Sequence, residues 1–204
     1  MKRFTAALLG LAALGVSACA TVPQVDVTQG LPAMSALPTN AVSGDWQVQE
    51  IVIDVSAELV VSESNRLKPR ADIVWREDPV GDRYAQVQAL MTEAMEFALR
   101  PMQGSTPVIV ELEVTRFHAL TERARYTIGG EHEVEFLFTV RDAQTGQALT
   151  GPRNIDLTFR AFGGQRAIDA ERDGIYQRDR IQSQIINWAR QEFGLTPPGG
   201  QFTS

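Results

Sequence analysis

Strict alternation of apolar and more polar residues is the clearest pattern in the second half of the chain. Three successive runs carry it: Val108, Val110, Leu112 and Val114; Val134, Phe136, Phe138 and Val140; and Ile155, Leu157, Phe159 and Ala161. A period of two is typical of β-strands with one buried and one solvated face. Because residues 142–146 have turn composition, the pattern predicts a three-stranded antiparallel meander that packs on one side only.

Two other segments show a helical period. Between 83 and 100, apolar residues recur every three or four positions, with Asp82 as a predicted N-cap and Pro101 after the end. A second amphipathic helix is predicted from the apolar residues between 181 and 189, which recur at helical spacing and so form one face. The charged stretch after Gly163 and Gly164, before this second helix, is predicted to be irregular.

The first half adds further strands. Residues 46–55 are rich in β-branched side chains and predict a strand, and 59–61 and 72–76 are shorter candidates. Two amphipathic helices and a one-sided sheet bury their apolar faces best against each other. We therefore predict an α+β fold, an antiparallel sheet of about four to five strands with a C-terminal three-stranded meander and two amphipathic helices on one face.

The first nineteen residues have the parts of a secretion signal. Lys2 and Arg3 precede an apolar run at 4–16, and small residues lead to Cys19, the only cysteine. A transmembrane span would need about 20 apolar residues, and an ordinary signal needs no cysteine after its cleavage site. The stretch resembles the lipobox of bacterial lipoproteins, which implies cleavage before Cys19 and attachment of diacylglycerol to its sulfur.

On this interpretation the chain has four parts. They are a signal peptide at 1–18, a lipidated flexible tether at 19–45, a single α+β domain at 46–194 and a disordered tail at 195–204. The apolar residues of the tether could instead pack along the domain: Leu31, Met34, Leu37 and Val42.

Composition narrows the function classes. Removal of residues 1–18 leaves 17 basic and 25 acidic residues, a net charge of −8, which argues against a nucleic-acid partner. The length fits one domain. With Cys19 acylated, no disulfide can form within the mature chain.

No enzyme motif is present in the sequence. It has no Gly-x-Ser-x-Gly, no phosphate-binding loop and no His-Glu-x-x-His, so we predict no catalytic residues and no cofactor. His118 and His132 fall at one end of the predicted meander, and Glu131 and Glu133 flank His132. Two histidines without recurring ligand spacing are more typical of polar strand ends than of a metal site, so no metal is predicted.

A candidate binding surface is predicted at this same end of the sheet. Its residues are Arg123, Arg125, Gly129, Gly130 and His132 in the first connection and Arg166 after the third strand. Arginine forks beside glycines suit a carboxylate or a phosphate, from a lipid head group or a partner protein. Arginine is also nearly the only basic residue of the mature chain, and glycines serve long loops, so a purely structural interpretation stays open.

The lipobox, the tether and the helix–meander–helix order, with Asp142, Thr145 and Gly146 in the turn, are together similar to small uncharacterised lipoproteins of Gram-negative, alphaproteobacterial envelopes. They are similar in outline to auxiliary lipoproteins of envelope transport systems. Because Ala20 follows the cysteine, the resemblance implies the periplasmic leaflet of the outer membrane.

The expected function is a non-enzymatic binding or scaffolding module of a cell-envelope complex, with a membrane anchor and a protein partner. The alternative is a periplasmic carrier of a small lipidic or anionic ligand. A carrier requires a hollow between helices and sheet, lined by Met91, Met95, Phe136 and Phe138.

Overall fold

The computed structural model describes residues 43–196. The predicted signal peptide, Cys19, the tether up to residue 42 and residues 197–204 lie outside the described residues.

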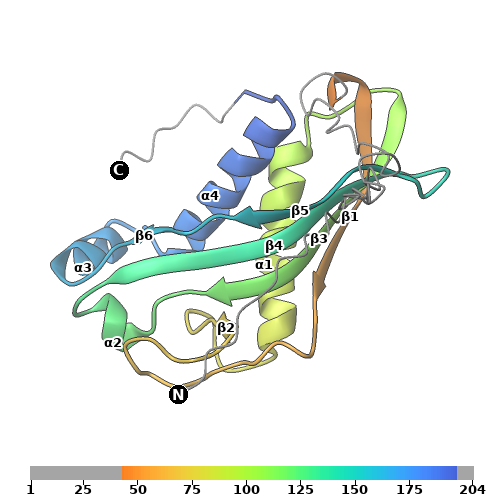
Figure 1. Ribbon diagram of the computed structural model, residues 1–204. Coiled ribbons are helices and arrows are strands. Elements are labelled where there is room, and N and C mark those ends of the chain that lie inside the picture. Colours follow the sequence, from red (N-terminus) through yellow and green to blue (C-terminus); the bar gives the residue numbers. More distant parts are fainter. Residues whose placement is uncertain (1–42, 197–204) are drawn as a thin grey trace, which may run out of the picture. The chain divides into compact units, whose positions relative to one another are not determined.

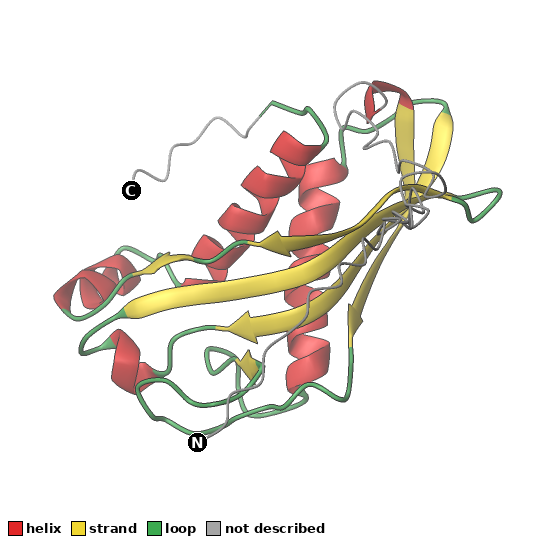
Figure 2. Ribbon diagram, viewed as in Figure 1, coloured by secondary structure: helices red, strands yellow, loops and turns green. Residues whose placement is uncertain are grey.

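The described residues form a six-stranded sheet with two long helices on one face (Figure 1 and Figure 2). The strands are β1 (Trp46–Val55), β2 (Ile73–Val74), β3 (Thr106–His118), β4 (Gly130–Asp142), β5 (Ala148–Asp156) and β6 (Phe159–Ala161). The helices are α1 (Arg83–Leu99), α2 (Glu122–Arg125), α3 (Gln165–Arg172) and α4 (Gln177–Glu192), and a 3-10 turn η1 (Ser43–Asp45) precedes β1. The predicted α+β class is confirmed.

Strands β3 and β4 lie at the centre of the sheet. β1 and then β2 pair along the outer edge of β3, whereas β5 and then β6 pair along the outer edge of β4. The β3–β4–β5 meander is antiparallel, as predicted. β1 and β2 run parallel to β3, since the chain crosses over through α1 before it enters β3, so the sheet is mixed.

The core lies between the sheet and the helices α1 and α4. Every predicted inward residue of β3 and β4 is at most 1% exposed: Val108, Val110, Leu112, Val114, Val134, Phe136, Phe138 and Val140. Trp188 of α4 meets the rings of Phe136 and Phe138 edge-on at centroid distances of 4.9 and 5.3 Å. On the opposite face Arg141 pairs with Glu111 at 2.7 Å, which is the cross-strand ion pairing expected of a solvated surface.

Three local predictions were wrong. The expected third strand is divided, because the Asp156 carboxylate accepts a hydrogen bond from the Thr158 N–H and turns the chain between β5 and β6. Residues 59–61 contribute only an isolated bridge from Val61 to Ile73. The stretch predicted to be irregular contains α3, whose buried side chains are only alanines and therefore give a weak apolar pattern.

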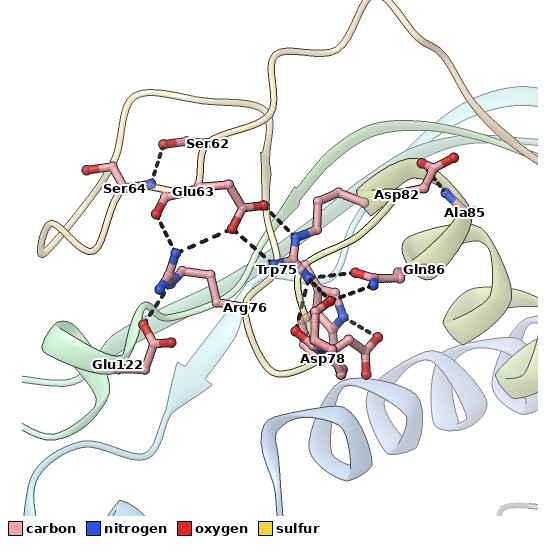
Figure 3. A network of polar contacts seen from close by, with 12 residues as sticks. Ser62, Glu63, Ser64, Trp75, Arg76, Asp78, Asp82, Ala85, Gln86 and Glu122 are labelled. Atoms are coloured by element: carbon pink, nitrogen blue, oxygen red, sulfur yellow. Dashed lines mark hydrogen bonds and ion pairs between the residues drawn. The ribbon is translucent and has the colours of Figure 1, made fainter.

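An ion-pair network holds the irregular segment between β1 and α1 (Figure 3). Arg83 is buried at the start of α1 and binds both carboxylate oxygens of Glu63, at 2.6 and 3.0 Å. Its Nη1 donates to the carbonyls of Asp78 and Pro79 and to Gln86. Asp82 caps α1 as predicted, by accepting from the Ala85 N–H.

Candidate functional site

The connection from β3 to β4 is anchored to the segment before β2. It contains the one-turn helix α2, whose N-cap Thr121 accepts from the Ala124 N–H and donates to the Arg66 carbonyl at 2.7 Å. The Arg123 N–H donates to the Asn65 side chain at 2.8 Å. Residues 65 and 66 therefore lie against α2, at the end of the sheet where the candidate surface was predicted (Figure 1).

A surface hollow of about 430 Å³ lies at this end, and we call it the hairpin-end hollow. It is lined by Leu67, Lys68, His118, Leu120, Ile128, Gly129, Gly130, Glu131, Glu133 and Arg160. Ile128 is 73% exposed and Leu67 is 41% exposed, so two large apolar side chains project at its border. Lys68, Glu131 and Arg160 add charges of both signs around it.

The glycines of this end serve backbone packing. A Cβ on Gly163 would lie 2.3 Å from the Gly129 Cα, so the two chain segments meet backbone to backbone. Gly129 has φ of 72°, in the left-handed region that favours glycine. Gly130 also has positive φ, and a Cβ there would meet Leu120 at 3.0 Å. The structural role that the sequence left open accounts for these glycines, two of which also line the hollow.

The three predicted arginines have different environments. Arg123 is exposed and Arg166 stacks on Phe162, with its guanidinium carbon 4.1 Å from the ring centroid. Neither pairs with a carboxylate within the described part of the chain. Arg125 is buried and its guanidinium is held by Glu77 at 3.3 Å and Glu171 at 2.5 Å. Arg125 is therefore a structural ion-pair partner and has no free fork for a ligand.

The Glu77 carboxylate also holds the start of α4. It accepts hydrogen bonds from the N–H groups of Gln177 and Arg178, both at 3.0 Å. A carboxylate at a helix N-terminus satisfies unpaired donors and the helix dipole together. Glu77 thus joins α2, through Arg125, to α4.

The two histidines are both buried and do different things. The His118 Nε2 lies 3.1 Å from the Pro69 carbonyl, and burial lowers the pKa of His118 below its usual value. His132 packs on Phe159, and its Nδ1 has no hydrogen-bond partner in the part of the chain that the structure describes. Burial, and then the neighbouring Arg180 and Arg125, lower the pKa of His132 to about 3. His132 is therefore neutral at physiological pH.

Glu133 lines the hairpin-end hollow together with His118. Burial alone would raise the pKa of Glu133, but hydrogen bonds from Lys68 and Arg116, both at 2.5 Å, hold it below its usual range.

Between residues 43 and 196, no group of three or more His, Cys, Asp or Glu side chains could hold a metal ion. No helix in this same range is long and apolar enough to cross a membrane.

Comparison with known proteins assigns the chain to a family. A model described as a family of unknown function, DUF6778, matches residues 46–201, which is most of the chain. The chain belongs to the DUF6778 family. No curated protein matches it.

A solved structure is similar to this DUF6778 chain at a low level. It is a crystal structure described as that of a "putative lipoprotein" from Caulobacter crescentus CB15, with 21% identity over 52% of this chain and 79% of that one. Its TM-score is 0.28, which does not establish a shared fold. The lipid anchor, the envelope location and the transport-system outline stay predictions for the DUF6778 chain.

Sequence reasoning missed several residues of this end in the DUF6778 protein. Ile128 and Leu67 lie in loops without periodicity, and only a large apolar residue beside loop glycines could have drawn attention to Ile128. Arg180 and Phe162, which face His132 from α4 and from the loop before α3, lie far from it in sequence. Their proximity follows from the pairing of β4 with β6, which the alternation pattern alone does not specify.

Proposed function

We propose that this DUF6778 protein is a lipid-anchored, non-enzymatic binding module of the cell envelope that receives a protein partner in the hairpin-end hollow. Cys19 carries the lipid, and the periplasmic leaflet of the outer membrane is its location. The observation that supports a binding role most directly is the hollow itself, bordered by the exposed side chains of Ile128 and Leu67. Exposed apolar side chains around a concave surface with a polar rim are typical of interaction sites.

The interior of the domain does not favour the carrier alternative. Met91, Met95, Phe136 and Phe138 are at most 1% exposed, and none of them lines the hairpin-end hollow. They form part of one tightly packed cluster with α1, α4 and the sheet. A ligand between helices and sheet would have to displace this packing, which costs several kcal/mol for a well-filled core.

Photocrosslinking in cells tests the docking site. A photoreactive amino acid at Ile128 is compared with one at Val80, which is 87% exposed in the turn before α1 and outside the hollow. The proposal expects one discrete protein adduct from position 128 and none from position 80. Equal adducts from both positions, or lipid adducts alone from position 128, contradict a protein partner in the hollow.

A second arm tests whether the apolar border is required. The photoreactive residue is placed at Leu67, and Ile128→Asp is introduced on the opposite border. The adduct should weaken at least about tenfold, because a buried apolar anchor typically contributes more than 1 kcal/mol to binding. Val80→Asp is the matched control and should leave the adduct unchanged.

The anchor has its own test. Mass spectrometry of the mature protein should find diacylglycerol on Cys19 as the first residue, and Cys19→Ala should move the protein from the membrane to the soluble fraction. An unmodified thiol at Cys19 overturns the anchor and leaves the hollow as a separate question.

A further inference from the structure

A small, partly open cavity lies between β4, α3 and the first turn of α4. Its volume is about 10 Å³, which is room for a single water-sized particle. His132 and Arg180 line it from opposite elements, and Phe162 and Tyr176 belong to its wall. We call it the Arg180 cavity.

Two buried polar atoms of this cavity's lining have no hydrogen-bond partner among residues 43–196. One is Nδ1 of His132, whose side chain is 1% exposed, and the other is Nη1 of Arg180. An unpaired buried donor or acceptor costs about 1–3 kcal/mol, more for charged groups, so a native structure normally provides a partner. Both atoms belong to side chains that line one cavity, and a single occupant could satisfy them together.

Charge decides which occupant fits. Arg180 donates to the Arg160 carbonyl at 3.0 Å and stacks on Phe162 with its guanidinium carbon 3.6 Å from the ring centroid. It pairs with no carboxylate in the described range, although six other partly or fully buried arginines do: Arg76, Arg83, Arg116, Arg125, Arg141 and Arg178. Arg180 therefore lacks a counterion.

None of the described carboxylates around the cavity forms a direct ion pair with Arg180. The second cation on Phe162 is Arg166, which lowers the pKa of Arg180 further after burial itself. The nearby carboxylates are already engaged, because Glu77 and Glu171 bind Arg125 and Asp179 accepts from the Tyr176 N–H at 2.8 Å. A water molecule could satisfy the two atoms, but it would leave the guanidinium of Arg180 without a direct counterion.

We propose that the Arg180 cavity holds one monoatomic anion of the chloride type, which accepts hydrogen bonds from Arg180 Nη1 and from the protonated Nδ1 of neutral His132. The volume admits one small particle and excludes phosphate or a carboxylate group. A halide ion is slightly larger than a water molecule. Phe162 and Tyr176 are partly exposed, so this part of the wall can move outward to make room for it. An anion here would also offset the cationic neighbours of His132 and raise its pKa. The site does not depend on the proposed docking function.

Nuclear magnetic resonance of the histidine rings tests the proposal on the full-length protein in detergent. The chain has two histidines, so His118 serves as an internal reference. Sodium chloride replaces sodium gluconate at constant ionic strength. We expect a saturable shift of the His132 ring nitrogens, with half-saturation below about 0.1 M, so that the site is more than half occupied at a physiological ionic strength of about 0.15 M. His118 should not respond.

Variants establish whether Arg180 holds the ion. Arg180→Gln should abolish the saturable shift. Arg180→Lys keeps the charge but loses the planar guanidinium, and it should weaken the shift. It replaces Arg180→Gln in the test if that variant does not fold. Arg190→Gln is the matched control, because Arg190 also lacks a carboxylate partner but stacks on Phe97, away from the cavity. An absent or non-saturating response, a response that persists in Arg180→Gln, or half-saturation far above 0.1 M overturns the site, the last as an adventitious ion only.

Crystals grown in sodium bromide give an independent readout. Bromide at the site should produce an anomalous peak between Arg180 and His132. A water peak without anomalous signal at that position would overturn the proposal. Neither measurement depends on a protein partner, so failure of the docking proposal and failure of this one are distinguishable.

Discussion

Acidification from pH 7.5 to 5.0 in a halide-free buffer should weaken the fold, mainly through His132. The folded-state pKa of this residue is about 3, whereas an unfolded histidine titrates near 6.5. Between these values the unfolded chain binds a proton that the folded chain does not, so the free energy of unfolding falls as the pH falls. Its contribution is complete above about pH 6.5 and is lost progressively below that value.

The size of the effect follows from the same two pKa values. Linkage gives a loss of about 2 kcal/mol between pH 7.5 and 5.0, close to the limiting slope of about 1.4 kcal/mol per pH unit at the acid end. Because His132 is almost completely buried, solvent screening does not reduce this figure much. The carboxylates with lowered pKa values, such as Glu63 and Asp78, add a similar acid loss mainly below this window.

Urea unfolding followed by tryptophan fluorescence at several pH values measures the effect. His132→Gln removes the titrating group and should flatten most of the slope, even if it lowers stability at every pH. His118→Gln should leave most of the slope, although burial lowers the pKa of His118 as well. A slope that is absent in the parent protein, or unchanged in His132→Gln, would refute the neutral buried histidine.

Three further variants test the fold by the same unfolding measurement. Arg83→Gln should lower the free energy of unfolding by about 2–4 kcal/mol, which is less than for a fully buried ion pair because Glu63 is partly exposed. Arg172→Gln, at an exposed ion pair, should lower it by less than about 0.5 kcal/mol. Equal losses in the two variants would contradict the buried network. Gly163→Ala should cost at least about 2 kcal/mol because its Cβ would meet backbone at 2.3 Å, and Gly44→Ala, with open space around it, should be neutral. Asp82→Ala should cost about 1 kcal/mol through loss of the α1 N-cap, and an unchanged midpoint would contradict that role.

Patterns of hydrophobicity predicted the elements that face the core on one side. The alternation in β3 and β4 and the helical period of α1 and α4 report directly which side chains are buried. They do not report strand direction, so the parallel pairing of β1 with β3 could not be derived from them. The edge strand β5 was placed too late because Gly151 and Pro152 interrupt it, and such residues are read as a turn although an edge strand tolerates them.

The sequence predicted at which end of the sheet the candidate site lies, but it predicted only some of the residues that form it. The meander brought Arg123, Gly129 and His132 to one end of the sheet, as expected from strand order. Which arginine turns inward depends on acidic partners that lie 46 and 48 positions away, and no local pattern encodes such a pairing. The apolar border and the Arg180 cavity likewise arise where separate segments meet.

The position of Arg125 determines which experiments can separate the two proposed sites. Its guanidinium bridges Glu77 and Glu171, and Glu77 at the same time caps α4, the helix that carries Arg180. A charge reversal at Arg125 would leave two carboxylates beside a third, release the cap and disturb the hollow and the cavity together. Ile128 lines only the hollow and Arg180 lines only the cavity, and Arg180 reaches the hollow only through its hydrogen bond to the backbone carbonyl of Arg160. Substitutions at these two positions can therefore assign a lost partner or a lost anion to one site, whereas a substitution at Arg125 cannot.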